Sequence, residues 1–127
     1  MSRFPCPCCG HLVFGEPPGS YDICQVCFWE DDALQLEYAT TLDGGANRTT
    51  LEAAQQNFAA LGACDELALD HVRPPTNAEA RDADWRPIDP QIDRFEIWGD
   101  PSGTRPHSRD ESLYYWRSTF WRNNPDG

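Results

Sequence analysis

The sequence predicts a small α+β fold, with a β-hairpin near the N-terminus, one or two helices and a C-terminal β-hairpin. Three observations predict it. Short apolar runs flank a turn rich in Gly and Pro, a later segment has apolar residues at helical spacing, and aromatic residues crowd near the C-terminus. The 127 residues are enough for one modest hydrophobic core. Eleven Pro and nine Gly indicate short elements connected by loops.

The N-terminal hairpin is expected from two apolar runs, HLVF at residues 11–14 and YDIC at residues 21–24. Between them, residues 15–19 read GEPPG, and Gly and Pro in this arrangement favour a turn. We therefore expect the two runs to pair as antiparallel strands.

The clearest helix is predicted to begin at Thr49 and to end near Gly62. Thr49 and Glu52 have the spacing of a capping box, and Gly is typical of a helix C-terminus. Apolar residues recur at intervals of three or four, which places them on one face: Leu51, Ala54, Phe58 and Leu61. A second short helix is expected within residues 64–72, because a pair of Pro residues follows it.

The C-terminal hairpin is expected from residues 93–99 and 112–123, because aromatic and β-branched residues favour extended structure. A short helix is the alternative for residues 112–123, since Leu113, Trp116 and Phe120 have helical spacing. Before it, residues 77–90 are mostly polar, which indicates a strap lying on the body of the protein and anchored by Trp85. Residues 98–122 interleave aromatic residues with Arg, a composition typical of a protein interface. A second small core sealed by this segment is the alternative.

Four cysteines form two CxxC pairs, whose spacing is typical of a metal site. Cys6 and Cys9 lie in the sequence CPCCG, where Pro restricts the turn and Gly10 can adopt the positive φ that folds the backbone under the sulfurs. On a hairpin, two such pairs make a zinc-ribbon-like arrangement. We predict one tetrahedral Zn²⁺ held by Cys6, Cys9, Cys24 and Cys27. Four thiolates leave no position for water, so this zinc is expected to be structural.

The remaining thiols and imidazoles have weaker claims to a chemical role. Cys8 is expected to be a partly exposed thiol beside the cluster; replacing Cys9 as a ligand, or acting as a reactive thiol, are the alternatives. His11 is expected to donate a hydrogen bond to a metal ligand rather than to bind the metal. Cys64 and His71 are interpreted as packing residues in preference to a catalytic pair.

Four blocks of the sequence occur together: CPCCG at residue 6, GSYDICQVCFWEDD at residue 19, GGANRTTLEAAQQNFAALGAC at residue 44 and HVRPP at residue 71. Together they resemble the CPCC-type cysteine-rich, zinc-ribbon-like family of bacterial proteins, over residues 3–88. The resemblance implies metal binding by the two CxxC pairs and carries over no catalytic residues, and it implies a link to immunity factors encoded beside secreted toxins. It divides the chain into a zinc-binding domain, 1–88, and an aromatic-rich extension packed on it, 89–127.

The cellular compartment is expected to be the cytoplasm. No run of roughly 18 apolar residues is present, and the chain does not open with an apolar signal segment, so neither a membrane span nor secretion is predicted. Cytoplasmic thiols are kept reduced, which favours metal ligation over disulfides.

The charge of the chain indicates the class of partner. With 21 acidic and 10 basic residues, the formal net charge is -11, and every basic residue is Arg. Such a chain is repelled by phosphate backbones, so nucleic-acid binding is not expected. We expect a basic protein as the partner instead. The alternative is that the acidic charge serves only to keep the protein soluble. The acidic run at residues 30–32 is expected to be a solvated face, with a cation site or an Arg-binding patch as alternatives.

Three functions follow from these observations. The first is a non-enzymatic, zinc-binding protein that binds a basic protein, plausibly an immunity protein that neutralises a bacterial toxin. The second is a zinc-ribbon adaptor in a cytosolic complex. The third is a thiol redox sensor or enzyme that uses Cys8 or Cys64. The sequence leaves the oligomeric state open.

Overall fold

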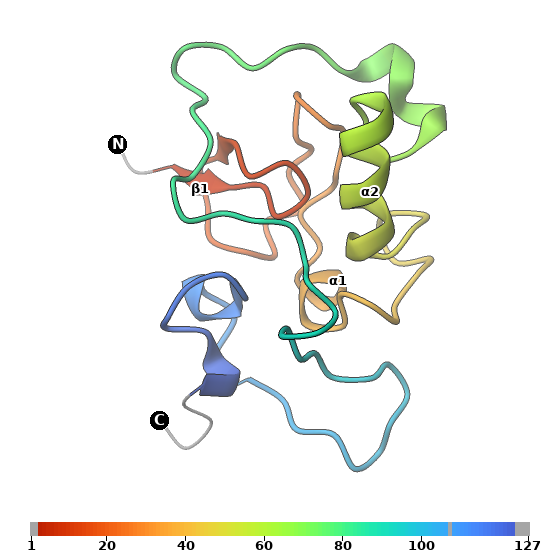
Figure 1. Ribbon diagram of the computed structural model, residues 1–127, viewed down its shortest axis with the longest axis vertical. Helices are drawn as coiled ribbons and strands as arrows, with labels where there is room; N and C mark the ends of the chain where they lie inside the picture. The colour runs from red at the N-terminus through yellow and green to blue at the C-terminus, as the bar shows by residue number, and fades with distance from the viewer. Residues whose placement is uncertain (1–2, 107, 124–127) are drawn as a thin grey trace.

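The computed structural model describes residues 3–106 and 108–123 (Figure 1). These residues form a mixed α/β structure with one two-stranded antiparallel sheet and few helices. The elements are β1 (Phe4–Pro5), β2 (Leu12–Phe14), α1 (Ala33–Glu37), α2 (Leu51–Leu61) and the 3-10 helices η1 (Glu66–His71), η2 (Glu111–Leu113) and η3 (Trp121–Asn123). Within the described part, no helix is long and apolar enough to cross a membrane.

The N-terminal hairpin differs from the predicted one. β2 is a strand as expected, but it pairs with β1, with Phe4 opposite Phe14. Residues 21–24 do not pair with it; instead Ile23 forms an isolated bridge with Glu30. The reason is that each CxxC pair is itself a tight turn. The segment before each turn thus pairs with the segment directly after it. Each cysteine pair therefore has its own small hairpin.

Helix α2 confirms the predicted helix, with its N-terminus one residue later than expected. The N-cap is Thr50, whose Oγ1 accepts a hydrogen bond from the Ala53 amide at 3.1 Å. Gly62 ends the helix with φ 86°, and its amide donates to the Phe58 carbonyl. Only the N-terminal part of the predicted apolar face is buried, and Leu61 is exposed. The second predicted helix is present as η1, a 3-10 helix.

The acidic run at residues 30–32 is not a solvated face, so that prediction is wrong. Asp31 and Asp32 are only 3% and 5% exposed. Asp31 accepts hydrogen bonds from the amide and hydroxyl of Ser20, and Asp32 accepts from the amides of Leu34 and Ala46. Because each carboxylate is satisfied by N–H and O–H donors, burial does not leave it without partners. Asp32 also starts α1, a short helix that the sequence did not predict.

A buried polar pair holds the loop between α1 and α2. The Gln35 side chain donates to the carbonyls of Leu42, Asn47 and Thr49, and its Oε1 accepts from the amide and side chain of Asn47. Asn47 in turn exchanges two hydrogen bonds with the backbone of Glu30. This pair therefore substitutes for regular secondary structure across the loop.

Replacing Gln35 by Met is expected to lower the free energy of unfolding by about 3 kcal/mol. The change keeps the side-chain volume but leaves several buried backbone and side-chain groups without partners, each costing about 1–3 kcal/mol. Chemical denaturation followed by circular dichroism measures it. The control is Gln56→Met on the exposed side of α2, and a similarly small effect for both variants would show that the network does not stabilise the fold.

The C-terminal β-hairpin is not present, and this prediction is also wrong. Residues 89–106 and 108–123 contain no strand; their regular structure is η2 and η3. Residues 113–116, Leu-Tyr-Tyr-Trp, are all buried in succession, whereas a strand turns successive side chains to opposite faces. Leu113 instead ends η2, the next three residues follow in an irregular turn, and all four side chains pack into the same core as the cysteines. This favours the core alternative over an interface for most of the aromatic segment.

The strap predicted at residues 77–90 runs beside the N-terminal hairpin (Figure 1), where Arg81 forms an isolated bridge with His11, directly before β2. The Leu12 amide donates to the Ala80 carbonyl, and the Asp82 amide donates to the Gly10 carbonyl. Trp85 anchors the strap, as expected, by donating its indole N–H to the Pro7 carbonyl at 3.0 Å. The division into 1–88 and 89–127 stays a prediction; residues 1–2, 107 and 124–127 lie outside the described residues.

Candidate metal centre

The first cysteine turn, residues 6–10, is closed by two backbone hydrogen bonds. The Cys6 amide donates to the His11 carbonyl at 2.9 Å, and the Gly10 amide donates to the Cys6 carbonyl at 2.7 Å. Gly10 has φ 81°, a conformation that suits glycine because it has no Cβ. The backbone therefore reverses under the turn and leaves both sulfurs on one side, as the CPxCG sequence predicted.

The second cysteine turn, residues 24–28, repeats this geometry. The Cys24 amide donates to the Trp29 carbonyl, and the Phe28 amide donates to the Cys24 carbonyl, both at 2.8 Å. Phe28 occupies the position that Gly10 has in the first turn, and its φ is 73°. This left-handed conformation is a strain for a residue with a bulky side chain. The Phe28 ring stacks on His71, with centroids 4.7 Å apart.

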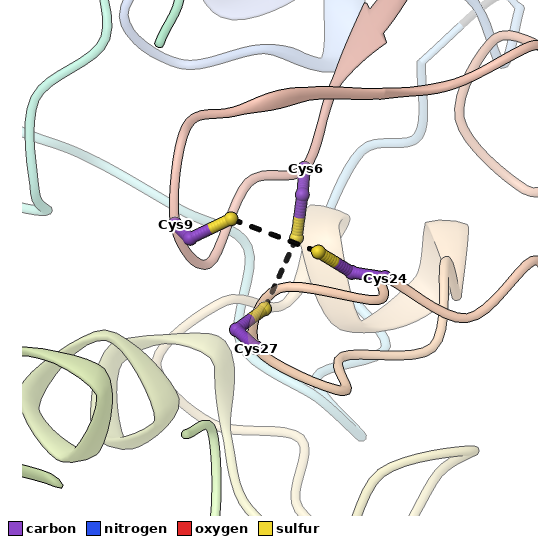
Figure 2. Close-up of side chains that lie close together, drawn as sticks. All are labelled: Cys6, Cys9, Cys24 and Cys27. Carbon is purple, nitrogen blue, oxygen red and sulfur yellow. Dashed lines mark hydrogen bonds between the residues drawn. The ribbon is translucent and has the colours of Figure 1, made fainter. Parts of the chain in front are cut away.

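The two turns bring four thiols together (Figure 2). The sulfur atoms of Cys6, Cys9, Cys24 and Cys27 all lie within 4.8 Å of one another, and all four residues are fully buried. The Cys6 and Cys27 sulfurs are 3.6 Å apart, and those of Cys9 and Cys24 are 3.7 Å apart. A disulfide requires about 2.05 Å, so these are free thiols.

The sulfur spacing fits a metal ion with four thiolate ligands. A tetrahedron with metal–sulfur distances of about 2.3 Å has sulfur–sulfur edges of about 3.8 Å. The two sulfur–sulfur contacts of 3.6 and 3.7 Å are close to this edge, and each joins a sulfur of one turn to a sulfur of the other. The four cysteines are therefore positioned to hold one metal ion between the two hairpins.

The comparison with protein families agrees with this arrangement. The family described as Cysteine-rich CPCC matches residues 4–79. The chain belongs to this family. The matched region contains all four cluster cysteines, α1, α2 and η1, and it ends at Glu79 rather than at residue 88, where the sequence resemblance was expected to end. A comparison with curated proteins found none that matches the chain.

Within this CPCC arrangement, Cys8 is not the partly exposed thiol that the sequence predicted. Its side chain is fully buried, and it is not among the four clustered sulfurs. Burial raises the pKa of the Cys8 thiol, which disfavours the thiolate that a reactive cysteine needs. A fixed, buried position between Pro7 and Cys9 follows from the tight backbone of the first turn.

His11 binds the strap and not a metal ligand. Its Nδ1 donates to the Glu79 carbonyl oxygen at 2.7 Å, so the expected hydrogen bond to a ligand sulfur is replaced by one that fixes residues 79–81 beside β2. Glu79 itself forms a paired contact with Arg73, and this guanidinium lowers the pKa of the Glu79 carboxyl to about 2.

Cys64 and His71 serve the second cysteine turn from outside the cluster. The Cys64 amide donates to the Cys27 carbonyl at 2.8 Å, and burial raises the pKa of the Cys64 thiol to about 12. His71 stacks on Phe28, and among the described residues no hydrogen bond joins it to the Cys64 sulfur. These positions favour packing roles. The Phe28 conformation was not predicted, although a Phe in the place of the knuckle Gly is visible in the sequence.

The protonation of the cluster depends on whether a cation is bound. Burial raises the pKa of Cys6 and Cys27, while hydrogen bonds from the neighbouring thiols, that of Cys27 first, lower the pKa of Cys24. Four thiolates cannot share this small buried space without positive charge. A bound divalent ion supplies that charge and keeps the ligands deprotonated.

Acidification is expected to release the bound ion and destabilise the fold together. The ion-bound state holds fewer protons on its four sulfurs than the released state does, so its stability falls as the pH falls. The measurement is metal content after equilibration between about pH 8 and about pH 4, with circular dichroism on the same samples. Cys64→Ser should follow the same curve, and metal retention that does not change with pH would contradict thiolate ligation.

Proposed function

We propose that the protein binds one structural Zn²⁺ through Cys6, Cys9, Cys24 and Cys27, in a zinc-ribbon-like arrangement. The observation that carries this proposal is the buried cluster of four sulfurs, whose separations of 3.6 and 3.7 Å suit the tetrahedral coordination that zinc prefers. Binding zinc to four thiolates contributes directly to folding free energy, because the site forms only when both hairpins are in place.

The surroundings of the site favour a non-enzymatic role. Four protein ligands leave zinc no coordination position for a substrate or an activated water. The other two thiols, Cys8 and Cys64, are buried and have raised pKa values. The redox-sensor or enzyme function is therefore the least supported of the three.

The surface charge favours a basic protein as the partner. Seven of the ten Arg side chains form ion pairs with carboxylates of the same chain: Arg48, Arg73, Arg86, Arg105, Arg109, Arg117 and Arg122. Among the residues that the structure describes, ten carboxylates are exposed: Glu16, Asp22, Asp43, Glu66, Asp70, Asp84, Asp89, Asp100, Asp110 and Glu111. Most of the arginines are paired with carboxylates of this chain, so they do little to offset the exposed carboxylates. With a net charge of -11, the surface therefore has a negative potential.

More specifically, we propose that the protein is an immunity protein that neutralises a bacterial toxin in the cytoplasm. If the toxin is a nuclease, the exposed carboxylates suit its phosphate-binding cleft. A zinc-ribbon adaptor in a cytosolic complex is the second candidate, supported by the same site and the same charge. Co-expression with the product of a neighbouring toxin-like gene distinguishes them, since only an immunity protein restores growth.

The test of the partner class is the salt dependence of association. Charges separated by more than a Debye length, about 8 Å at physiological salt, are largely screened. A pull-down with the zinc-loaded protein from its own cells captures the partner, and the rate at which the two associate is expected to fall steeply as salt rises. An association rate that does not change with salt, or a partner with an acidic surface, would contradict the proposal.

A further inference from the structure

A small groove lies between the second cysteine turn and η1. Its volume is about 150 Å³, and its apolar lining comes from Ile23, Phe28, Leu67 and Ala68, with Cys64 also present. An enclosed apolar cavity of this volume holds a benzene ring, and this groove offers a comparable space that is open to solvent on one side. We call this feature the Phe28 groove.

Two of the apolar residues at the groove are exposed. Leu67 is 65% exposed and Ile23 is 41% exposed, and both line the groove. Single exposed apolar residues are common, but exposed apolar residues gathered around a hollow are typical of a binding site.

The groove wall is also held in a fixed, strained conformation. Phe28 keeps φ 73° because its amide is bonded to the Cys24 carbonyl and its ring is stacked on His71. Strained backbone of this kind persists where neighbouring structure enforces it, and it is concentrated at ligand-binding sites. Because Phe28 follows Cys27 directly, the metal centre keeps this wall in place.

Charge determines which apolar ligand suits the groove. Glu30 and Asp65 line it, and the single basic residue in its lining, Arg48, lies 3.8 Å from Asp65 and is largely exposed. Glu30 has no ion-pair partner among the described residues. Exposed acidic residues also precede Ile23 and Leu67 in the chain, at positions 22 and 66.

We propose that the Phe28 groove binds one apolar side chain of about the size of a benzene ring, from a partner segment in which Arg or Lys flanks that residue. The apolar side chain fills the hollow between Phe28 and Leu67, and the flanking cations face Glu30 and the neighbouring carboxylates. This inference deepens the proposed function, on which it rests, because it assigns the recognition of a basic protein to a particular surface.

The test uses the zinc-loaded protein and the peptide Arg-Arg-Phe-Arg-Arg as the probe. Titration followed by ¹⁵N NMR is expected to shift the amides of Ile23, Phe28 and Leu67 and to give a saturating curve. The peptide Arg-Arg-Ser-Arg-Arg keeps the charge and removes the ring, so it is expected to bind about tenfold more weakly. The peptide Glu-Glu-Phe-Glu-Glu keeps the ring, and we expect no saturation with it.

Matched variants locate the site. Leu67→Ser is expected to weaken binding of the Phe-containing peptide about tenfold. Leu69→Ser is the control, because Leu69 is on the same 3-10 helix and 45% exposed but lies outside the groove lining. It is expected to leave the affinity unchanged. Glu30→Gln should weaken binding of the same peptide, and Glu111→Gln should leave it unchanged. All four substituted residues are at least partly exposed, so an unchanged amide spectrum verifies the fold.

Two outcomes overturn the inference. If the Phe and Ser peptides bind equally and Leu67→Ser has no effect, the acidic surface acts without the groove, and the proposed basic partner still stands. If no peptide shifts the groove amides, the groove is not the recognition surface; the salt dependence of the captured partner then decides the proposed function separately.

Discussion

Replacing Cys24 or Cys9 by Ser is expected to abolish metal binding and unfold the two N-terminal hairpins. Both thiols are fully buried, and their sulfurs are 3.7 Å apart in the cluster. Structural zinc contributes about 10–16 kcal/mol of apparent binding free energy in small domains, which is as large as the whole stability of a typical protein. Metal content per chain and thermal unfolding measure the effect.

Cys8→Ser is the matched control, because Cys8 is equally buried in the same turn but lies outside the sulfur cluster. It is expected to keep its metal and to lose only a little stability. Cys64→Ser should behave in the same way. If Cys8→Ser loses the metal while Cys9→Ser keeps it, the ligand pair is Cys6 and Cys8, and the assignment is wrong.

Replacing Gly10 by Ala is expected to lower the free energy of unfolding by about 2–5 kcal/mol. The positive φ of 81° costs a residue with a Cβ about 1–2 kcal/mol. A Cβ at Gly10 would also lie 2.6–2.9 Å from ring carbons of Trp85, and displacing that ring costs about 1–3 kcal/mol more. Trp85 would then lose its hydrogen bond to the Pro7 carbonyl. Denaturant unfolding of the metal-loaded protein measures the change.

Gly44→Ala separates the two contributions. Gly44 also has a positive φ, 75°, but no atom lies within 4 Å of a Cβ built there. It is expected to lose only the conformational part, about 1–2 kcal/mol. Equal losses for the two variants would mean that Trp85 moves away without cost and does not constrain the first cysteine turn.

The cluster of four cysteines could be predicted from the sequence because its parts are local. Each pair of cysteines is separated by two residues, and the tight turn between them places both sulfurs on one side, whatever the rest of the chain does. Helix α2 was predictable for the same reason, since the signals at its two ends lie within the helix and its caps. Even there, the capping residue moved from Thr49 to Thr50.

The remainder could not be predicted because it depends on contacts between distant residues. The sequence at residues 30–32 shows three acidic residues, but only the fold supplies Ser20 and Ala46 as hydrogen-bond donors to the buried pair Asp31 and Asp32. Similarly, the aromatic residues at 114–116 favoured a strand, yet they and Leu113 all pack into one core. The Phe28 groove has the same origin, since η1 closes it from across the fold.

The most direct test of the central claim is zinc-edge X-ray absorption of the purified protein, combined with elemental analysis. We predict one zinc per chain with four sulfur ligands at about 2.3 Å and no nitrogen or oxygen ligand. Less than about half an equivalent of zinc in a metal-replete preparation, or a first coordination sphere with fewer than four sulfurs, would contradict a closed site formed by Cys6, Cys9, Cys24 and Cys27.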